Sequence, residues 1–465
     1  MGYKVMRLWR VGGLVCLLGC AHATEPPPPQ ERSRAAADYT VTIYDNFAGA
    51  HVRVCLEGAT VHELVPISDD GAHRLRGARI EGHALDTAGG RIRLGQPSQA
   101  TCVHYETRFG PPMFRTSEPS AIIVSQTQWL WRPDPFPSEL DASVRFVLPS
   151  DGRVSLPWPR LDATYLPDES AFFTGAFGVF GLFDRQAFSV ASTSVDIARL
   201  GPRPPDDEVR RWLGRAMRAT ASVGDRFPRD QVHFVIVPTP TEEKQVAFGM
   251  VRRGGGSSVL LLPSPNATVD QLEADWVAIH ELSHLWLPAL RPKDRWISEG
   301  IATYLQEVLR ARCGLQSGEH AWTRLQEGFE RGRRSGTGRP LASESRDMNR
   351  TGAYHRVYWA GAAFALETDV RLRENSNGNM TLLHAISDGQ RVWGTEARPV
   401  EASVLLRALE EASGASFIEG LGATYALSSS FPRIAYVDSP RYREIRARIM
   451  SRADDACRLS AESSR

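Results

Sequence analysis

The stretch HELSHLW, His280 to Trp286, decides how this chain is interpreted. Its two histidines, His280 and His284, are four residues apart. On a helix this spacing places both rings on one face, where they can share a metal ion. Glu281 follows the first histidine and flanks the same face, so it can take a proton from zinc-activated water. The alternative is an ordinary amphipathic helix that carries two buried histidines.

A third ligand candidate follows in the segment DRWISEGIATYLQ. Fourteen residues separate His284 from Glu299 in this segment. Pro288 and Pro292 lie in between and predict a turn from one helix into the next. Two histidines and one glutamate with an open fourth position are a ligand set of catalytic zinc. The sequence therefore predicts one Zn²⁺ per chain.

HELSHLW and WISEGIATYLQ together resemble the gluzincin metallopeptidases of clan MA, in particular the aminopeptidase N and glycyl aminopeptidase families. Members carry an HExxH helix and then a W-x-x-E-G helix, whose glutamate is the third zinc ligand. The turn between the helices is shorter here than in aminopeptidase N relatives. The resemblance covers roughly residues 210–373 and implies a thermolysin-like catalytic domain.

The resemblance also implies an oxyanion-stabilising tyrosine downstream. In YHRVYWAGAAF, Tyr358 matches the family tyrosine, with Ala360 in place of a lysine and Gly361 retained. Tyr358 would donate a hydrogen bond to the developing tetrahedral oxygen. The alternative is an aromatic residue that only packs in the core, and Tyr354 is a weaker candidate for the same role.

The resemblance is incomplete where aminopeptidase N relatives carry G-x-M-E-N, whose glutamate grips the substrate amine. This chain has VAFGMVRRGGGSSVLLLP, with arginines at 252 and 253 where the acid belongs. An arginine cannot hold an ammonium group, so aminopeptidase specificity is in doubt. The glycines allow backbone to approach a ligand, although a flexible hairpin tip is an equal alternative. The candidate substrate-binding residues are Gly249, Met250, Arg252, Gly254 and Gly255.

The N-terminus predicts export. Basic residues precede a short apolar run that ends in LLGC, which resembles a bacterial lipobox with Cys20 as the lipidated residue. We expect a signal peptide over 1–19 and a proline-rich flexible tether over 20–38. A plain signal peptide with a chance cysteine is the alternative. The expected product is an exported bacterial lipoprotein of the cell envelope, held to the membrane by its N-terminal lipid.

Composition and cysteine usage agree with an exported globular protein. The 465 residues carry a formal net charge of +1, which gives no reason to expect a nucleic-acid partner. Outside the signal and Cys20, four cysteines remain, and an oxidising compartment favours disulfides among them. The preferred pairs are Cys55–Cys102 and Cys313–Cys457, since each then lies within one domain. The other connectivities and four free thiols stay open.

Patterning divides the rest of the chain in two. Short alternating runs over 39–188 predict an N-terminal β domain. Helical periodicity dominates 189–465, and Thr268 with Gln271 predicts a capping box at the head of the helix that carries HELSHLW. The expected fold class is multidomain α+β, in which the β domain precedes a mostly helical, thermolysin-like zinc peptidase domain.

Two functions follow from these features. The first is a membrane-tethered zinc metallopeptidase that acts on peptides or proteins, with Glu281 as general base. The second is a non-catalytic peptide-binding or scaffold lipoprotein that retains the peptidase fold. The missing amine-binding acid supports the second function, and the presence of Glu281 supports the first. The sequence leaves the substrate, the cleavage mode and the oligomeric state open.

Overall fold

The computed structural model describes residues 35–110, 121–190, 192–201, 206–224, 226–394, 398–434, 439–453 and 457. The predicted signal peptide, Cys20 and the tether up to residue 34 lie outside these residues. The predicted tether is too long, because residues 35–38 already belong to the first strand, Ala35–Ile43. Within the described residues, no helix has both the length and the apolar character that crossing a bilayer requires.

The N-terminal part is built on a nine-stranded sheet, as the alternating sequence runs predict. Eight strands follow the order β10-β11-β8-β1-β2-β5-β3-β4, and β7 pairs with β2. Their bounds are β1 Ala35–Ile43, β2 Gly49–Pro66, β3 Leu75–Ile80, β4 His83–Ala84, β5 Ile92–Arg108, β7 Trp131–Asp134, β8 Leu140–Val147, β10 Arg160–Leu161 and β11 Thr164–Tyr165. The short helix α1 is Asp69–Arg74, and the 3₁₀ turns are η1 Ala88–Gly90, η2 Gln126–Gln128 and η3 Glu169–Phe172.

A three-stranded sheet connects this domain to the rest of the chain. Its order is β6 (Ala121–Ser125), β12 (Phe177–Gly181) and β9 (Arg153–Ser155). The aromatic, glycine-rich segment FFTGAFGVFGLF therefore contains a strand, and every residue of β12 is buried.

The second domain begins with a five-stranded mixed sheet of order β13-β14-β15-β17-β16. The strands are β13 Asp184–Val190, β14 Thr193–Arg199, β15 Gln231–Ile236, β16 Val246–Arg253 and β17 Ser257–Pro263. β14, β15 and β17 are parallel, whereas β16 is an antiparallel edge strand. The predicted domain boundary at 188/189 cuts through β13, so the second domain starts earlier than expected.

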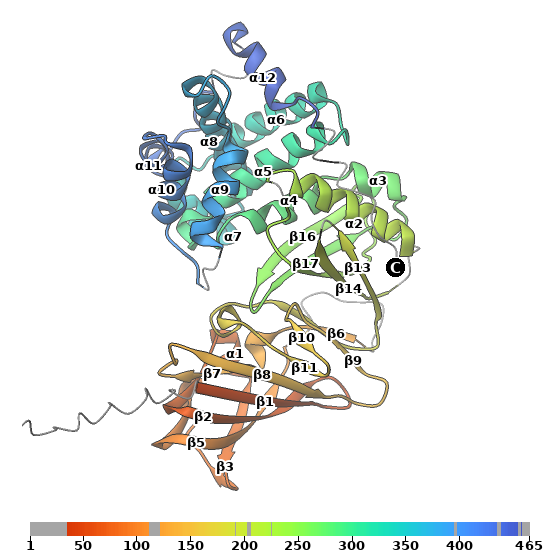
Figure 1. Ribbon diagram of the computed structural model, residues 1–465, viewed down its shortest axis with the longest axis vertical. Helices are drawn as coiled ribbons and strands as arrows, with labels where there is room; N and C mark the ends of the chain where they lie inside the picture. The colour runs from red at the N-terminus through yellow and green to blue at the C-terminus, as the bar shows by residue number, and fades with distance from the viewer. Residues whose placement is uncertain are drawn as a thin grey trace, which may run out of the picture.

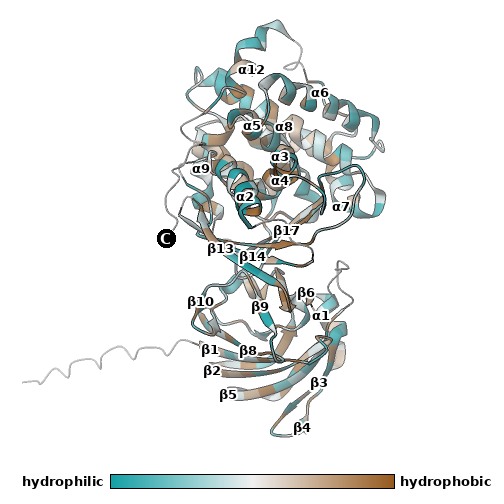
Figure 2. Cartoon of the chain, turned by 90° about the vertical axis from the view of Figure 1, so that its right-hand side faces the viewer, coloured by the Kyte–Doolittle hydropathy of each residue, from teal (hydrophilic) through white to brown (hydrophobic). Residues whose placement is uncertain are grey.

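Both faces of this sheet are covered, which explains its continuous apolar runs. In β17, Val259 and Leu261 face the helical core, while Leu260 and Leu262 face the three-stranded sheet. Figure 1 shows the five-stranded sheet between the N-terminal domain and the helices. In Figure 2 the apolar colour gathers on β17 and in the interior of the helical part, and the hydrophilic colour marks outer helices such as α6.

The helical part confirms that the second domain is mostly helical, as expected from the sequence. The helices are α2 Asp206–Ala221, α3 Val269–Ala274, α4 Val277–Ser283, α5 Arg295–Arg312, α6 Gly318–Arg334, α7 Leu341–Thr351, α8 Tyr354–Asn375, α9 Leu382–Trp393, α10 Ala402–Ser413, α11 Ile418–Leu427 and α12 Arg443–Ile449. The 3₁₀ turns η4 His284–Trp286, η5 Pro292–Asp294 and η6 Pro440–Tyr442 join them. Gly314 follows the end of α5 in the left-handed conformation, with φ of 69°.

The capping box caps a different helix from the one expected. The Thr268 hydroxyl accepts from the Gln271 N–H, and the Gln271 side chain accepts from Thr268 in return. The helix they cap, α3, ends at Ala274, because Asp275 is extended with ψ of 152°. A carboxylate oxygen of Asp275 then accepts from the Val277 N–H at 2.7 Å, and α4 begins there. The HELSHLW helix is thus a separate element.

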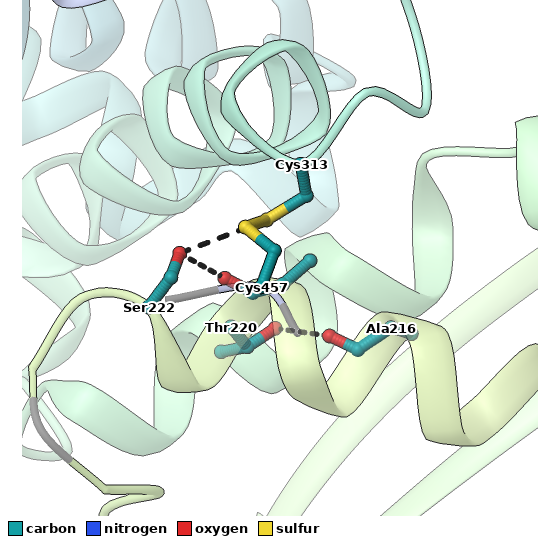
Figure 3. The surroundings of a disulfide bond; sticks show 6 residues. Ala216, Thr220, Ser222, Cys313 and Cys457 are labelled. Carbon is teal, nitrogen blue, oxygen red and sulfur yellow. Dashed lines mark hydrogen bonds between the residues drawn. A yellow bond between two sulfur atoms is a disulfide. The ribbon is translucent and has the colours of Figure 1, made fainter. Parts of the chain in front are cut away.

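Two disulfides are present, and their pairing is the one preferred from the sequence: Cys55–Cys102 and Cys313–Cys457. The first joins directly opposed residues of β2 and β5. The second ties the residue after α5 to the C-terminal segment, next to the end of α2, where the Ser222 hydroxyl lies 3.9 Å from the Cys313 sulfur (Figure 3).

Candidate metal centre

The helix α4 and the turn η4 carry the two histidines. α4 ends at Ser283, so His284 lies in the first position of η4 rather than on the same regular helix. The two rings still meet on one face, with centroids 4.9 Å apart. All seven residues of α4 are buried, which holds this face in the molecular interior.

Glu299 completes the cluster from the second turn of α5. One of its carboxylate oxygens lies 3.4 Å from Nε2 of His280 and 3.3 Å from Nε2 of His284. The ligand atoms of the three residues all lie within 4.8 Å of one another, and they are the one such group found in the described part of the chain. The three ligand candidates chosen from the sequence are therefore brought together.

The donor set fits zinc. Two imidazole nitrogens and one carboxylate oxygen are the ligands of catalytic zinc sites, and they leave one coordination position open. The charge state of Glu299 also favours a bound cation. Burial by itself would raise the pKa of Glu299, but His284 and His280 hold it well below its usual value. A carboxylate that stays ionised here balances the charge of a divalent ion.

The orientation of His280 is fixed by a residue not anticipated from the sequence. Nδ1 of His280 lies 2.8 Å from Oε1 of Gln306, and Nε2 of Gln306 donates to Glu307 at 3.0 Å. Glu307 is fully buried and also binds Arg310. Gln306 follows Glu299 by seven residues on α5, two helical turns, so helix periodicity could have indicated its position.

Tyr358 reaches the cluster because α5 and α8 cross at two glycines. A Cβ on Gly300 would lie 2.1 Å from Cα of Gly361, and a Cβ on Gly361 would lie 2.0 Å from the carbonyl oxygen of Trp296. Only glycines allow the two backbones to approach so closely. The crossing places Glu299 and Tyr358, which precede these glycines, at one site.

The ring of Tyr358 stacks on His280, with centroids 5.9 Å apart and planes inclined by 13°. Burial raises the pKa of Tyr358 well above its usual value, and the charges of Glu299 and Glu281 raise it further. The phenol therefore keeps its proton and can donate it in a hydrogen bond. Tyr354 is 42 % exposed and donates to Asn349 at 3.3 Å, so its hydroxyl is directed elsewhere.

Glu281 lies between the histidines and the edge strand β16. Its side chain is buried, and its carboxylate accepts a hydrogen bond from the Val251 N–H. Burial raises the pKa of Glu281, although the two histidines oppose this effect. A Cβ on Gly249 would lie 2.6 Å from Cγ of Glu281 and 2.6 Å from Cγ1 of Val277. Gly249 therefore provides the space that the Glu281 carboxylate occupies.

The other predicted substrate-binding residues divide into two groups. Met250 packs on the opposite face of β16, against the apolar cluster beneath the three-stranded sheet, and Arg252 is exposed. Gly254 and Gly255 instead contact the N-terminal domain. The Gly254 carbonyl accepts from the Trp158 indole at 2.6 Å, and the Gly255 N–H donates to Ser170 at 2.8 Å. The close backbone approach expected from the glycines is therefore to another domain of the same chain.

Arg253 has a structural role that the sequence did not indicate. Its guanidinium is buried and donates to the carbonyl oxygens of His284 and Leu287, at the end of the HELSHLW segment. Burial lowers the pKa of Arg253 to about 10, a value at which the group stays charged near neutral pH. These hydrogen bonds hold strand β16 against the HELSHLW segment, which carries both histidines.

The similarity of this chain to known proteins lies in its fold. No protein-family model matches the chain, and no curated protein sequence matches it either. Among solved structures, an aminopeptidase N family protein from Idiomarina loihiensis is 17% identical with a TM-score of 0.64, covering 85% of this chain and 77% of that one. An M1 zinc metallopeptidase mutant from Deinococcus radiodurans, bound to a Tyr-Ser-Ala substrate, is 15% identical with a TM-score of 0.53, covering 86% and 96%. The chain therefore has the two-domain fold of M1 zinc metallopeptidases.

Proposed function

We propose that the chain is a zinc metallopeptidase that hydrolyses peptide bonds. The supporting observation is that Glu281 and Tyr358 lie directly beside the cluster of His280, His284 and Glu299, although these residues come from α4, the adjoining turn η4, α5 and α8. A site that only held a structural metal would need neither a buried carboxylate nor a buried phenol next to it. The fold shared with M1 zinc metallopeptidases gives independent support.

The residues divide the chemistry among them. When bound by the three ligands, zinc supplies Lewis-acid chemistry that activates water and the scissile carbonyl. Glu281 takes a proton from the attacking water and delivers it to the leaving amine nitrogen, and its raised pKa favours proton acceptance. The Tyr358 hydroxyl donates a hydrogen bond to the carbonyl oxygen of the substrate as negative charge develops on that oxygen.

Kinetics of two variants test this assignment. Glu281→Gln keeps size and position but removes the base, and the expected loss of kcat is ~10²–10⁴ with zinc retained. Tyr358→Phe removes only the phenolic donor, and the expected loss is roughly 10²–10³ with little change in KM. Tyr354→Phe is the matched control and should keep wild-type kinetics, since its hydroxyl is directed away. Cleavage products of a peptide library, followed by mass spectrometry, provide the substrate for these measurements.

The non-catalytic alternative gives a different result. A peptide-binding or scaffold protein would cleave no member of the library, or would turn over equally well as wild type and as Glu281→Gln. If Tyr358→Phe kept wild-type kinetics while Glu281→Gln did not, the zinc assignment would stand and the oxyanion donor would be another residue. A loss of activity in Tyr354→Phe would then assign that role to Tyr354.

We further propose that the second domain, from β13 onward, is a thermolysin-like peptidase domain. The antiparallel edge strand β16 beside α4 supports this description, since such a strand can align an extended peptide along the metal site. Cleavage of internal bonds would agree with an open edge of this kind, and end-group analysis of the products distinguishes internal from terminal cleavage.

We also propose that the protein is a lipoprotein of the cell envelope, anchored through Cys20 after removal of residues 1–19. The LLGC sequence and the proline-rich stretch after it support this proposal. Cells grown with labelled palmitate should label the wild type and not Cys20→Ser. Equal labelling of both would rule out the anchor.

A further inference from the structure

We propose that the disulfide Cys55–Cys102 is a site of thiol–disulfide exchange, which a dithiol protein reductant opens while the fold of the chain stays intact. Its strands, β2 and β5, lie at the end of the molecule away from the helical part in Figure 1. The inference therefore does not depend on the proposed peptidase function. The group that reacts there is an anionic thiolate, which positive charge beside a partly exposed sulfur pair favours.

The disulfide lies on the outer face of the nine-stranded sheet. Strands β2 and β5 direct alternate side chains to opposite faces of the sheet. Val52, Val54 and Val103 point inward and belong to the core of the N-terminal domain. Cys55 and Cys102 occupy the alternate positions, and both are partly exposed. A thiol of a second protein can therefore approach them, which exchange requires.

The outer face also carries a guanidinium in contact with one of the two sulfur atoms. Arg53 precedes Cys55 by two residues on β2, so both side chains lie on the same face. Nη2 of Arg53 donates to Sγ of Cys102 at 3.2 Å. Among the described residues, no carboxylate forms an ion pair with Arg53. The positive charge of Arg53 is therefore directed at the disulfide.

This contact predicts the direction of the exchange. A thiolate of the reductant attacks Sγ of Cys55 and forms a mixed disulfide with it. The bond between the two cysteines breaks, and Cys102 leaves as a thiolate beside Arg53. A guanidinium that stabilises the departing thiolate accelerates this step.

The second step completes the electron balance. The other thiol of the reductant, as a thiolate, attacks the mixed disulfide and releases Cys55 as a thiolate. The two protons of the reductant's thiols are taken up by Cys55 and Cys102. The chain's disulfide is thereby reduced to two thiols by two electrons, and the dithiol of the reductant is oxidised to a disulfide.

The sheet does not need this disulfide to stay paired. Residues 49–57 of β2 pair one to one with residues 100–108 of β5, and Cys55 and Cys102 are directly opposed within this stretch. On its other side, β2 pairs with β1. Backbone hydrogen bonds therefore hold the two cysteines opposite each other after reduction, so that the site can be oxidised again.

The other disulfide, Cys313–Cys457, provides an internal reference. It lies near the end of α2, with the Ser222 hydroxyl 3.9 Å from Sγ of Cys313 (Figure 3). Within the described residues, no guanidinium donates a hydrogen bond to either of its sulfur atoms. We therefore expect it to open more slowly than Cys55–Cys102 in the same molecules.

Limited reduction of the full chain tests the inference, with reduced thioredoxin as the dithiol probe. Timed samples are alkylated, digested and quantified by mass spectrometry at all four cysteines. We expect Cys55–Cys102 to open roughly tenfold faster than Cys313–Cys457. A thioredoxin variant without its resolving cysteine should be trapped as a mixed disulfide at Cys55. Far-UV circular dichroism should not change when Cys55–Cys102 opens.

Substitutions of Arg53 test the role of its charge. Arg53→Gln should slow the opening of Cys55–Cys102 roughly fivefold and leave the rate at Cys313–Cys457 unchanged. Arg53→Lys keeps the charge and should retain part of the rate.

Arg145→Gln is the matched control for the loss of one positive charge. Arg145 is an exposed residue of β8, and Thr40 of β1 pairs with Arg53 on one side and with Arg145 on the other. Arg145 is thus two strands away from Arg53 on the same sheet, and its substitution should leave the rates at both disulfides unchanged.

Several results would overturn the inference. Opening of Cys313–Cys457 as fast as or faster than that of Cys55–Cys102 would show that the outer face is not the preferred exchange site. An Arg53→Gln rate equal to that of wild type, or trapping of the thioredoxin variant at Cys102, would contradict the role of the guanidinium. Loss of the β-sheet signal on opening would show that the disulfide is needed for the fold.

Discussion

Nδ1 of His280 and Oε1 of Gln306 are hydrogen-bonding partners 2.8 Å apart, and Gln306 fixes which tautomer the imidazole adopts. Nε2 of Gln306 donates to the buried Glu307, which can only accept, so the amide must turn its oxygen toward His280. Nδ1 of His280 is therefore the protonated nitrogen. Its Nε2 keeps a free lone pair directed at Glu299 and His284, as a metal ligand requires.

Substitution of Gln306 should weaken metal binding. Gln306→Leu keeps the approximate volume but removes the acceptor, so His280 is free to change tautomer or rotate. Loss of such an orienting partner typically costs about 10–100-fold in metal affinity. Competition with a fluorescent zinc chelator measures this, and far-UV circular dichroism checks that the fold is intact. An unchanged zinc affinity in a folded Gln306→Leu protein would show that Gln306 does not orient the ligand.

Glu299 should be indispensable for the metal. Glu299→Ala leaves two histidines, and because the three ligands act as one chelate, the zinc affinity should fall by orders of magnitude. Metal analysis after dialysis gives the stoichiometry, expected near one zinc per wild-type chain and far below one in the variant. Glu281→Gln is the control and should keep its zinc. Stoichiometric zinc in Glu299→Ala would contradict the ligand assignment.

The close crossing of α5 and α8 predicts an effect of Gly361. A Cβ at this position would meet the Trp296 carbonyl oxygen at 2.0 Å and Cα of Gly300 at 2.7 Å. Both obstacles are backbone, so Gly361→Ala should separate the helices and lower the free energy of unfolding by about 1–3 kcal/mol. Activity should fall too, because Tyr358 would move away from His280.

A second glycine serves as the matched control. Gly420 lies in α11, and a Cβ at this position would have no atom of another residue within 4 Å apart from its chain neighbours and the helix backbone. Gly420→Ala should therefore leave activity unchanged and raise the free energy of unfolding by about 0.5–1 kcal/mol, since alanine favours helix. Urea denaturation of both variants makes the comparison. Equal stability changes would mean that the helix crossing is not as tight as described.

The metal site could be predicted because its information is local. His280, Glu281 and His284 share one turn, and Glu299 and Tyr358 occur in short motifs that resemble known ones. The fold class followed from alternation in the first part of the chain and helical periodicity in the second. Those features need no knowledge of distant contacts.

The features that were missed have two kinds of cause, a local side-chain cap in one case and contacts between distant segments in the others. The helix break at Asp275 replaced one expected helix by α3 and α4, because a side-chain cap outcompeted continuation of the helix. Gly254 and Gly255 lie in the turn between β16 and β17. They form hydrogen bonds with Trp158 and Ser170, which are far away in sequence. The role of Arg253 likewise depends on a distant contact, because the carbonyl oxygen of His284 that it binds lies 31 residues further along the chain.

A buried histidine between the two domains predicts how stability depends on pH. His233 of β15 is fully buried, and its Nε2 lies 2.9 Å from the hydroxyl of Ser155 in β9. Nδ1 has no partner among the described residues. Asp196 lies nearby, but its carboxylate is bound by Arg185 at 2.8 and 2.9 Å. Burial therefore dominates and lowers the pKa of His233 from 6.5 to about 4.

The sign of the effect follows from proton uptake. Between pH 6.5 and 4, His233 is protonated in the unfolded chain but neutral in the folded one, so the unfolded state binds more protons. The stability contribution is complete above pH 6.5 and is lost as the pH falls toward 4. The total loss from this residue should be roughly 3 kcal/mol. His233→Gln removes the titration, so the variant should lose less stability over this range. Urea denaturation at several pH values gives the slope of the free energy of unfolding against pH for wild type and variant. The difference between the two free energies at pH 7 measures any packing cost of the substitution separately. Identical slopes in wild type and His233→Gln would show that His233 does not stay neutral in the folded protein.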